Sequence, residues 1–202
     1  MTMDNTLKEM FSEAMWIAHS LFERGKTSGT TANLSFRFGD NVWITRSGSC
    51  FGTLGSDDFV CVERSGHVVN DGNPSKELPL HLALYDACEA TQAVIHIHAP
   101  YSTLWSCLPH EDARDVIPHY TPYLQMKLGA VVDVPYAPPG TEELFSIMRN
   151  TIGEEKGYLL CNHGPIVAGR TLMHAFECIE ELEQGAWLAW NAYLSSQPFR
   201  SI

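Results

Sequence analysis

The sequence predicts a three-layer α/β/α sandwich built around a largely antiparallel β-sheet. Short strand-like segments occur in pairs joined by turn residues, which is typical of antiparallel hairpins. Amphipathic helical segments precede, separate and follow these strands, so helices are available to cover both faces of a sheet. The chain has 202 residues and no internal repeat or linker-like segment, and we therefore expect a single domain over residues 1–202.

The first predicted element is an amphipathic helix. Between Leu7 and Phe22 apolar residues recur at steps of three and four, and we expect Asn5 to cap this helix and Gly25 to follow its end. The other elements are predicted from the same periodicities and from turn residues. We expect strands at 33–37 and 42–45, a second hairpin from 60–62 and 67–69, a helix at 77–88, a strand at 93–98, a helix at 103–108, a strand at 131–134, a helix at 142–149, strands at 158–161 and 166–168, and a long helix at 172–194.

The charge balance argues against a nucleic-acid or membrane partner. The formal net charge is −11, from 13 basic and 24 acidic residues, and no basic cluster stands out along the chain. An anionic ligand would therefore need a locally positive site, which a metal ion and helix N-termini can provide. No apolar run approaches the roughly 18 residues that span a bilayer.

The cysteines favour a reducing compartment. The chain has 6 cysteines with no CxxC pair, and its N-terminus does not resemble a secretory signal. We therefore expect free thiols and a cytoplasmic protein.

Three histidines form a candidate metal site. His96 and His98 are two residues apart on a predicted strand, so both imidazoles should face the same side, with Ile97 on the other. His163 follows a later strand, with a glycine after it that leaves room for a substrate. Three imidazoles and an open position are typical of catalytic zinc, although another divalent ion is possible. Taken by itself, the HxH pair is explained better by two structural histidines than by a metal site.

Two segments are candidates for binding an anion. Residues 45–49 and 74–77 place hydroxyls and backbone amides after a strand and at a helix start, and Lys76 adds a positive charge. Glu77 follows directly, and beside a cation its carboxylate could act as a general acid/base. The alternative is a first-turn glutamate that interacts only with the helix dipole. His81, one turn later, is expected to support the site or the packing and not to bind metal.

These motifs together resemble the class II aldolase/adducin family over nearly the whole chain. The segments that carry the resemblance are ANLS at 32–35, TRSG at 45–48, PSKE at 74–77 with PLHL at 79–82, HIHAPYS at 96–102 and NHG at 162–164. The resemblance implies the α/β/α fold, zinc on the three histidines, and Glu77 as the acid/base. It also implies a homotetramer whose sites lie between subunits.

The same resemblance implies particular contacts with substrate. Phosphate contacts are expected at Asn33, Ser47, Gly48 and Ser75, and Tyr120 resembles a tyrosine that some members contribute across the subunit interface. Two positions depart from the usual pattern: Ala32 replaces a glycine, and Lys76 replaces the second serine of the sugar-phosphate aldolases. We expect Lys76 to bind either a phosphate or a carboxylate.

The PSKE form, with SGSCFG at 47–52 and PYAPPG at 135–140, is most similar to the 3-oxo-tetronate 4-phosphate decarboxylase branch of the family. Such an enzyme would release CO2 from a phosphorylated sugar acid through a metal-stabilised enediolate and form dihydroxyacetone phosphate. A sugar-phosphate aldolase would use the same metal and the same enediolate. Epimerisation and a non-catalytic, adducin-like module are further alternatives.

Overall fold

The centre of the fold is a seven-stranded mixed sheet. The computed structural model describes residues 4–195 and 197–202. The strands are β1 (Asn33–Phe38), β2 (Asn41–Thr45), β3 (Phe59–Glu63), β4 (Ala93–His96), β5 (Val131–Val134), β6 (Gly157–Leu160) and β7 (Gly164–Gly169). Their order is β3-β2-β1-β4-β7-β6-β5, with β5 parallel to β6 and the other neighbours antiparallel. The predicted largely antiparallel sheet is confirmed.

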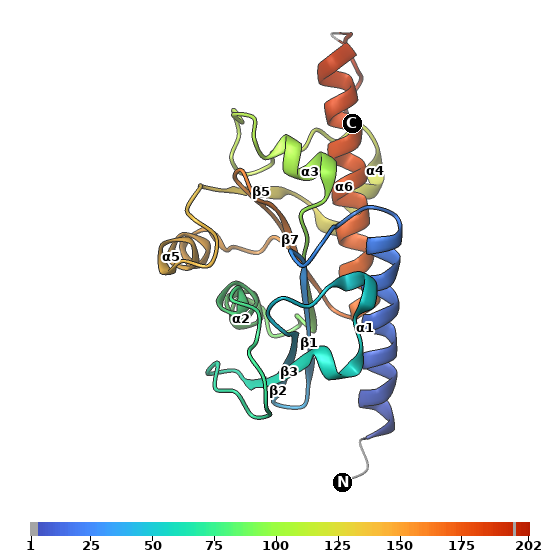
Figure 1. Ribbon diagram of the computed structural model, residues 1–202. Coiled ribbons are helices and arrows are strands. Elements are labelled where there is room, and N and C mark those ends of the chain that lie inside the picture. The colour runs from blue at the N-terminus through green and yellow to red at the C-terminus, as the bar shows by residue number, and fades with distance from the viewer. Residues whose placement is uncertain (1–3, 196) are drawn as a thin grey trace.

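Helices cover both faces of this sheet (Figure 1). They are α1 (Asn5–Glu23), α2 (Leu78–Ala87), α3 (Pro100–Trp105), α4 (Pro122–Leu128), α5 (Glu142–Thr151) and α6 (Leu172–Ser195), with short 3-10 turns η1 (Phe51–Thr53) and η2 (Ser56–Asp58). The long helices α1 and α6 lie on one side together with α3 and α4, whereas α2 and α5 lie on the other. The three-layer prediction is therefore confirmed.

Strand β4 shows how the sheet divides the core into two layers. Ile95 and Ile97 belong to the apolar cluster beneath α1 and α6, whereas Val94 belongs to the cluster beneath α2 and α5. Alternate residues of a strand point to opposite faces. His96 therefore shares the α2 side with Val94, and Ile97 points into the opposite layer, as the sequence predicts.

Three details of the predicted elements differ in the structure: a helix cap, a hairpin and the end of a strand. The cap of α1 is Asp4, whose side chain accepts the N–H of Thr6 over 2.8 Å, and Asn5 is already helical. The second hairpin is reduced to one isolated bridge between Val62 and Val68. The strand that holds His96 ends at that residue, and not at His98.

Helices α3 and α4 also differ from the sequence predictions. Helix α3 begins at Pro100 instead of residue 103, because proline is favoured in the first turn of a helix. Helix α4 was not predicted. Its buried Leu124 and Leu128 belong to the cluster beneath α6, and Leu124 packs where Gly185 of α6 carries no side chain.

The six cysteines are free thiols. Among the helices of residues 4–195 and 197–202, none has both the length and the apolar character that crossing a bilayer requires.

Candidate active site

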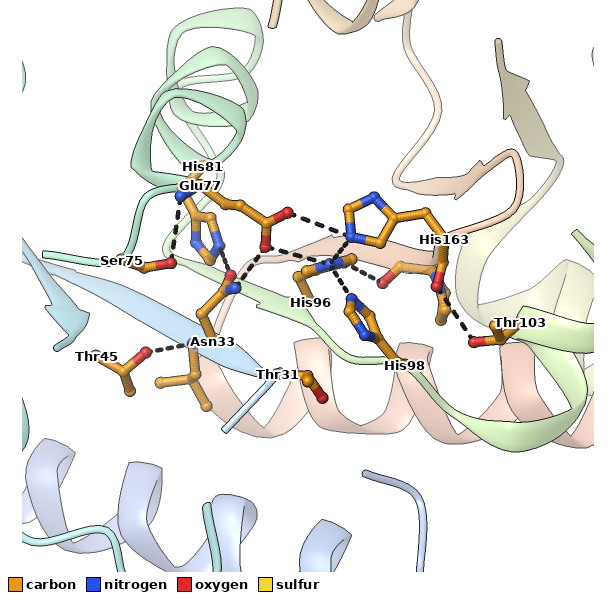
Figure 2. A network of polar contacts seen from close by, with 12 residues as sticks. Thr31, Asn33, Thr45, Ser75, Glu77, His81, His96, His98, Thr103 and His163 are labelled. Atoms are coloured by element: carbon orange, nitrogen blue, oxygen red, sulfur yellow. Dashed lines mark hydrogen bonds and ion pairs between the residues drawn. The ribbon is translucent and has the colours of Figure 1, made fainter. Parts of the chain in front are cut away.

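Three imidazoles meet at one end of the central strands (Figure 2). His96 ends β4, His98 lies two residues later, and His163 lies in the turn between β6 and β7. The Nε2 atom of His96 lies 3.2 Å from Nε2 of His98 and 3.3 Å from Nε2 of His163. One ligand atom from each ring lies within 4.8 Å of the other two. The predicted histidines thus come together from segments 67 residues apart.

Strand pairing holds His163 beside the other two rings. Pairing of Leu160 with Gly164 leaves a three-residue turn between β6 and β7, in which Asn162 adopts a positive φ of 54°. Asparagine tolerates this conformation better than most residues. On the other side of β7, His96 is the register partner of Ile166. The tip of one hairpin is therefore fixed against the end of β4.

The hydrogen bonding of His96 determines which nitrogen faces the cluster. Its Nδ1 lies 2.8 Å from the carbonyl oxygen of Pro165, which can only accept, so Nδ1 carries the proton. The lone pair of Nε2 consequently points toward His98 and His163. Burial lowers the pKa of both His96 and His163 to about 3, which keeps these rings neutral near pH 7. Neutral imidazole is the form that binds metals.

The separations fit a divalent cation. With Zn–N bonds of about 2.0–2.1 Å, tetrahedral ligand atoms lie roughly 3.3–3.4 Å apart. The two Nε2 separations from His96, 3.2 and 3.3 Å, are close to that spacing. Neutral rings that direct lone pairs at one point repel one another unless a cation or a proton lies between them. The three residues could therefore hold a metal ion.

Glu77 completes this cluster from the other side. Its Oε1 lies 3.3 Å from Nε2 of His163, and its Oε2 lies 3.4 Å from Nε2 of His96. The residue immediately precedes α2 and is only 8% exposed. Ser75 fixes the backbone here, because its hydroxyl accepts the N–H of Glu77 over 3.3 Å. A carboxylate is therefore available next to any ion held by the histidines.

A cavity of about 230 Å³ opens beside the histidines and Glu77. The predicted site residues that line it are Asn33, Ser47, Gly48, Ser75, Lys76, Glu77, His98 and His163. His96 does not line the cavity but contacts Glu77, as described above. This size suits a small molecule.

Backbone bonds place the two predicted anion segments side by side. The N–H of Ser75 donates to the carbonyl of Thr45 over 3.0 Å, and the N–H of Ser47 donates to that of Asn73 over 2.9 Å. Gly48, with φ of +81°, forms an open turn at the cavity wall. The cavity therefore combines backbone groups, hydroxyls and the Lys76 side chain in the manner of an anion site.

Tyr120 is the predicted residue that the structure does not bring to this site. It precedes α4, packs on Phe199 with ring centroids 5.6 Å apart, and does not line the cavity. A role for Tyr120 in this cavity would require a second subunit.

The structure also adds residues that the sequence analysis did not assign. Thr31 and Gly140 line the cavity, and Gly140 lies in the 135–140 segment that contributes to the resemblance. A buried network from Glu77 through Asn33 to His81 was not predicted. Its only sequence signal is the four-residue spacing of Glu77 and His81.

Comparisons with known proteins match most of the chain. Residues 12–190 match the family model described as Class II Aldolase and Adducin N-terminal domain. The 3-oxo-tetronate 4-phosphate decarboxylase of Escherichia coli K12 is 38% identical over 187 residues, covering 92% of this chain and 87% of the relative. The L-fuculose phosphate aldolase of Methanococcus maripaludis C7 is 30% identical over 172 residues, covering 85% of this chain and 91% of the relative.

A solved structure extends the agreement to the whole fold. The crystal structure of YgbL from Escherichia coli superimposes with a TM-score of 0.91 at 36% identity, covering 96% of this chain and 93% of YgbL. Together with the family-model match over residues 12–190, these relatives extend across the sheet, the histidine cluster and the cavity. The chain belongs to the family of class II aldolase and adducin N-terminal domains.

Proposed function

We propose that this protein is a metal-dependent lyase that decarboxylates a 3-oxo-tetronate 4-phosphate, giving dihydroxyacetone phosphate and CO2. The observation that carries the proposal is Lys76 in the cavity, beside Glu77 and the histidines, in a chain 38% identical to a decarboxylase of that name. A substrate with both a phosphate and a carboxylate carries more negative charge than a sugar phosphate without a carboxylate, so its site needs more positive charge, and Lys76 supplies part of it.

His96, His98 and His163 would hold the ion, with zinc as the expected metal because three neutral imidazoles and an open position suit it. A bound divalent cation supplies Lewis acidity that draws electrons toward the 3-carbonyl oxygen of the substrate. The role of the surrounding residues is to orient the substrate so that its carboxylate can leave and its C2 atom faces Glu77.

Glu77 would move the proton of the reaction. The C1–C2 bond breaks, CO2 leaves, and the electron pair remains on C2 and the adjoining carbonyl. The carboxyl group of Glu77, or a water that it holds, donates a proton to C2 and regains one from solvent. Its low exposure and its contacts with His96 and His163 support this role.

The hydroxyls and amides around the cavity would bind the phosphate. Ser47, Gly48 and Ser75 lie on two segments that backbone bonds hold together, which supports a common anion site. Lys76 lies between Ser75 and Glu77 in sequence and can reach either a phosphate or a carboxylate.

The second candidate is aldol cleavage of a sugar phosphate. It is favoured by the 30% identity to the L-fuculose phosphate aldolase of Methanococcus maripaludis C7. The same histidines and Glu77 would serve it, because both reactions leave an electron pair beside a carbonyl. A non-catalytic module is disfavoured by the convergence of three histidines and a carboxylate.

A homotetramer in the cytoplasm is also proposed, with Tyr120 completing the cavity of a neighbouring subunit. Exposed apolar side chains on α4 and α6 support contact between subunits: Tyr123, Met126, Tyr193 and Leu194. Light scattering after size-exclusion chromatography tests the assembly, and Met126→Glu should produce a smaller species.

The reaction is tested by incubating the zinc-loaded protein with a 3-oxo-tetronate 4-phosphate and measuring CO2 and dihydroxyacetone phosphate together. Formation of both products in equal amounts, abolished by a chelator and restored by zinc, is expected. Glu77→Gln should keep the metal and lower turnover. Cleavage of L-fuculose 1-phosphate without any CO2 release would favour the aldolase instead.

A further inference from the structure

Two rows of polar side chains interlock between α2 and β1, and Figure 2 shows the end of the network that Asn33, Glu77 and His81 form. Glu77 at the N-cap of α2 and His81 and Tyr85 within the helix recur every four residues. Asn33 and Ser35 are alternate residues of the strand. Four residues of helix advance about 6 Å, and two residues of strand advance about 6.7 Å. The two rows therefore have nearly the same spacing, and their members can alternate.

Four short hydrogen bonds join the two rows. Nδ2 of Asn33 lies 2.7 Å from Oε2 of Glu77, and Oδ1 of Asn33 lies 2.5 Å from Nε2 of His81. The hydroxyl of Ser35 lies 2.7 Å from Nδ1 of His81 and 2.8 Å from the hydroxyl of Tyr85. All five residues are buried, and each has at least one hydrogen-bond partner in the other row.

The acceptor at one end sets the donor-to-acceptor direction of this chain of hydrogen bonds. Oε2 of Glu77 accepts from Nδ2 of Asn33, so Oδ1 of Asn33 faces His81. His81 must then donate from Nε2, which leaves its Nδ1 as an acceptor for the hydroxyl of Ser35.

The far end of the chain is closed by Tyr85. With the Ser35 proton directed at His81, the Ser35 oxygen accepts from the Tyr85 hydroxyl. Burial raises the pKa of Tyr85 and lowers that of His81 to about 3, so near pH 7 both keep the protonation state that this order requires.

We propose that this directed hydrogen-bond chain, from Tyr85 through Ser35 and His81 to Asn33, positions the carboxylate of Glu77. The proposal rests on the acid/base role of Glu77 in the proposed reaction. Asn33, His81, Ser35 and Tyr85 are positioning residues in this scheme.

The chain constrains Glu77 in a way that packing alone would not. The Asn33 bond fixes Oε2, so that the carboxylate plane cannot rotate freely and Oε1 keeps a defined direction next to His163. A free asparagine amide could turn over and present oxygen to the carboxylate. The donor on His81 prevents this, because it binds only the oxygen end of the amide. A displaced proton donor lowers turnover without necessarily weakening substrate binding.

The first test measures the tautomer of His81 directly. In metal-free protein labelled with ¹⁵N-histidine, NMR should show His81 protonated on Nε2 and bare on Nδ1, with its signals identified by their loss in His81→Gln. Protonation on Nδ1 would overturn the directed chain. This measurement needs neither substrate nor metal, so it is decided independently of the proposed reaction.

The second test measures turnover and KM of zinc-loaded variants. Asn33→Ala and His81→Leu should lower kcat by about 10- to 100-fold while KM and zinc content stay unchanged. His81→Gln should recover part of that loss, because its amide can donate from nearly the same position as Nε2. Tyr85→Phe should give a smaller loss in kcat, since it removes only the last donor.

Tyr158→Phe is the matched control. Tyr158 is another fully buried tyrosine, and its hydroxyl donates to the carbonyl of Glu155 over 3.0 Å, away from the cavity. It should leave kcat unchanged. Equal losses in Tyr85→Phe and Tyr158→Phe, or a rise in KM alone for Asn33→Ala, would overturn the positioning role. A wild-type protein that releases no CO2 would refute the proposed reaction. The tautomer of His81 would still show whether the hydrogen-bond chain has the proposed direction.

Discussion

His96 donates its Nδ1–H to the carbonyl oxygen of Pro165 over 2.8 Å, and the backbone N–H of Ile97 donates to the same oxygen over 3.3 Å. One acceptor on β7 thus fixes both the end of β4 and the orientation of the imidazole. Because the proton is held on Nδ1, Nε2 is left to bind a cation. Such a bond to the second ring nitrogen is typical of histidines that bind metal.

Replacing either His96 or His163 by alanine should remove the metal. Each substitution leaves two imidazoles, which bind a divalent ion far more weakly than three. Zinc content after dialysis against a weak chelator measures the effect, and His67→Ala is the control because that side chain is exposed and distant in sequence from the cluster. Full zinc occupancy in either cluster variant would contradict the ligand assignment.

Gly164→Ala should damage the metal site through the backbone. A Cβ at this position would lie 2.6 Å from the carbonyl oxygen of Ile97, and φ of +149° is unfavourable for alanine. We expect a loss of about 3 kcal/mol in the free energy of unfolding and weaker zinc binding, because the turn with His163 must move away from β4.

Gly39→Ala is the control for this substitution. Gly39 also has a positive φ, +61°, but a Cβ there would meet nothing within 4 Å. It should cost only about 1 kcal/mol and leave zinc affinity unchanged. Urea denaturation and zinc titration of the two variants separate strain at a turn from displacement of His163. Equal zinc affinities in the two variants would contradict the argument.

Glu183 should be required for the start of α3, just after His98. Its buried carboxylate accepts the N–H of Tyr101 over 3.1 Å, and both the N–H and the hydroxyl of Ser102 over 2.8 Å. Glu183→Ala leaves the two backbone N–H groups without this acceptor and should lower the free energy of unfolding by about 2–4 kcal/mol.

A surface glutamate on the same helix provides the comparison. Glu177 pairs with Lys127 at 2.6 Å, but its side chain is 42% exposed. Glu177→Ala should therefore change the free energy of unfolding by less than about 1 kcal/mol. Urea denaturation of both variants checks the difference. Similar losses would mean that the bonds of Glu183 to α3 contribute little.

Much of the fold follows from local patterns in the sequence. The apolar periodicity between Leu7 and Phe22 predicts α1, and β5 has the predicted bounds. The HxH spacing predicts that Ile97 points away from His96, and the two core clusters bear this out. In each case one element carries its own signal in the spacing of its residues.

The missed features depend on contacts between distant segments. Helix α4 is short, and its apolar residues are explained by packing against distant segments such as α6 and Gly157 of β6. The bond from Asn33 to His81 joins residues 48 positions apart, and no local pattern states that β1 lies beside α2. The predicted role of Tyr120 depends on a contact with another copy of the chain, which no pattern within one sequence segment can predict.

Lys76→Ser should weaken substrate binding in the proposed reaction more than it lowers kcat. The substitution removes a positive charge from the wall of a cavity in a protein with net charge −11, so an anionic substrate loses part of its attraction. KM for the phosphorylated acid measures the effect. Lys76→Arg should retain most of the affinity, and Lys8→Ser, an exposed lysine on α1, should leave KM unchanged. An unchanged KM in Lys76→Ser would remove this residue from the site.

The metal-free protein should lose stability as the pH falls below about 6.5. Burial lowers the pKa of His81 and His96 from 6.5 to about 3. Between these pH values the unfolded chain binds more protons than the folded chain, so the free energy of unfolding decreases as the pH decreases. The expected slope is about 1.4 kcal/mol per pH unit for each such histidine.

Urea denaturation at pH 7 and pH 5 measures this loss of stability. His81→Gln should show a smaller pH difference than the wild-type protein, because one buried histidine no longer contributes. Zinc should stabilise the protein at pH 7 and much less at pH 5, since protons compete for the imidazoles that would bind it. A stability that is the same at both pH values would show that His81 and His96 accept protons as readily in the folded protein as in the unfolded chain.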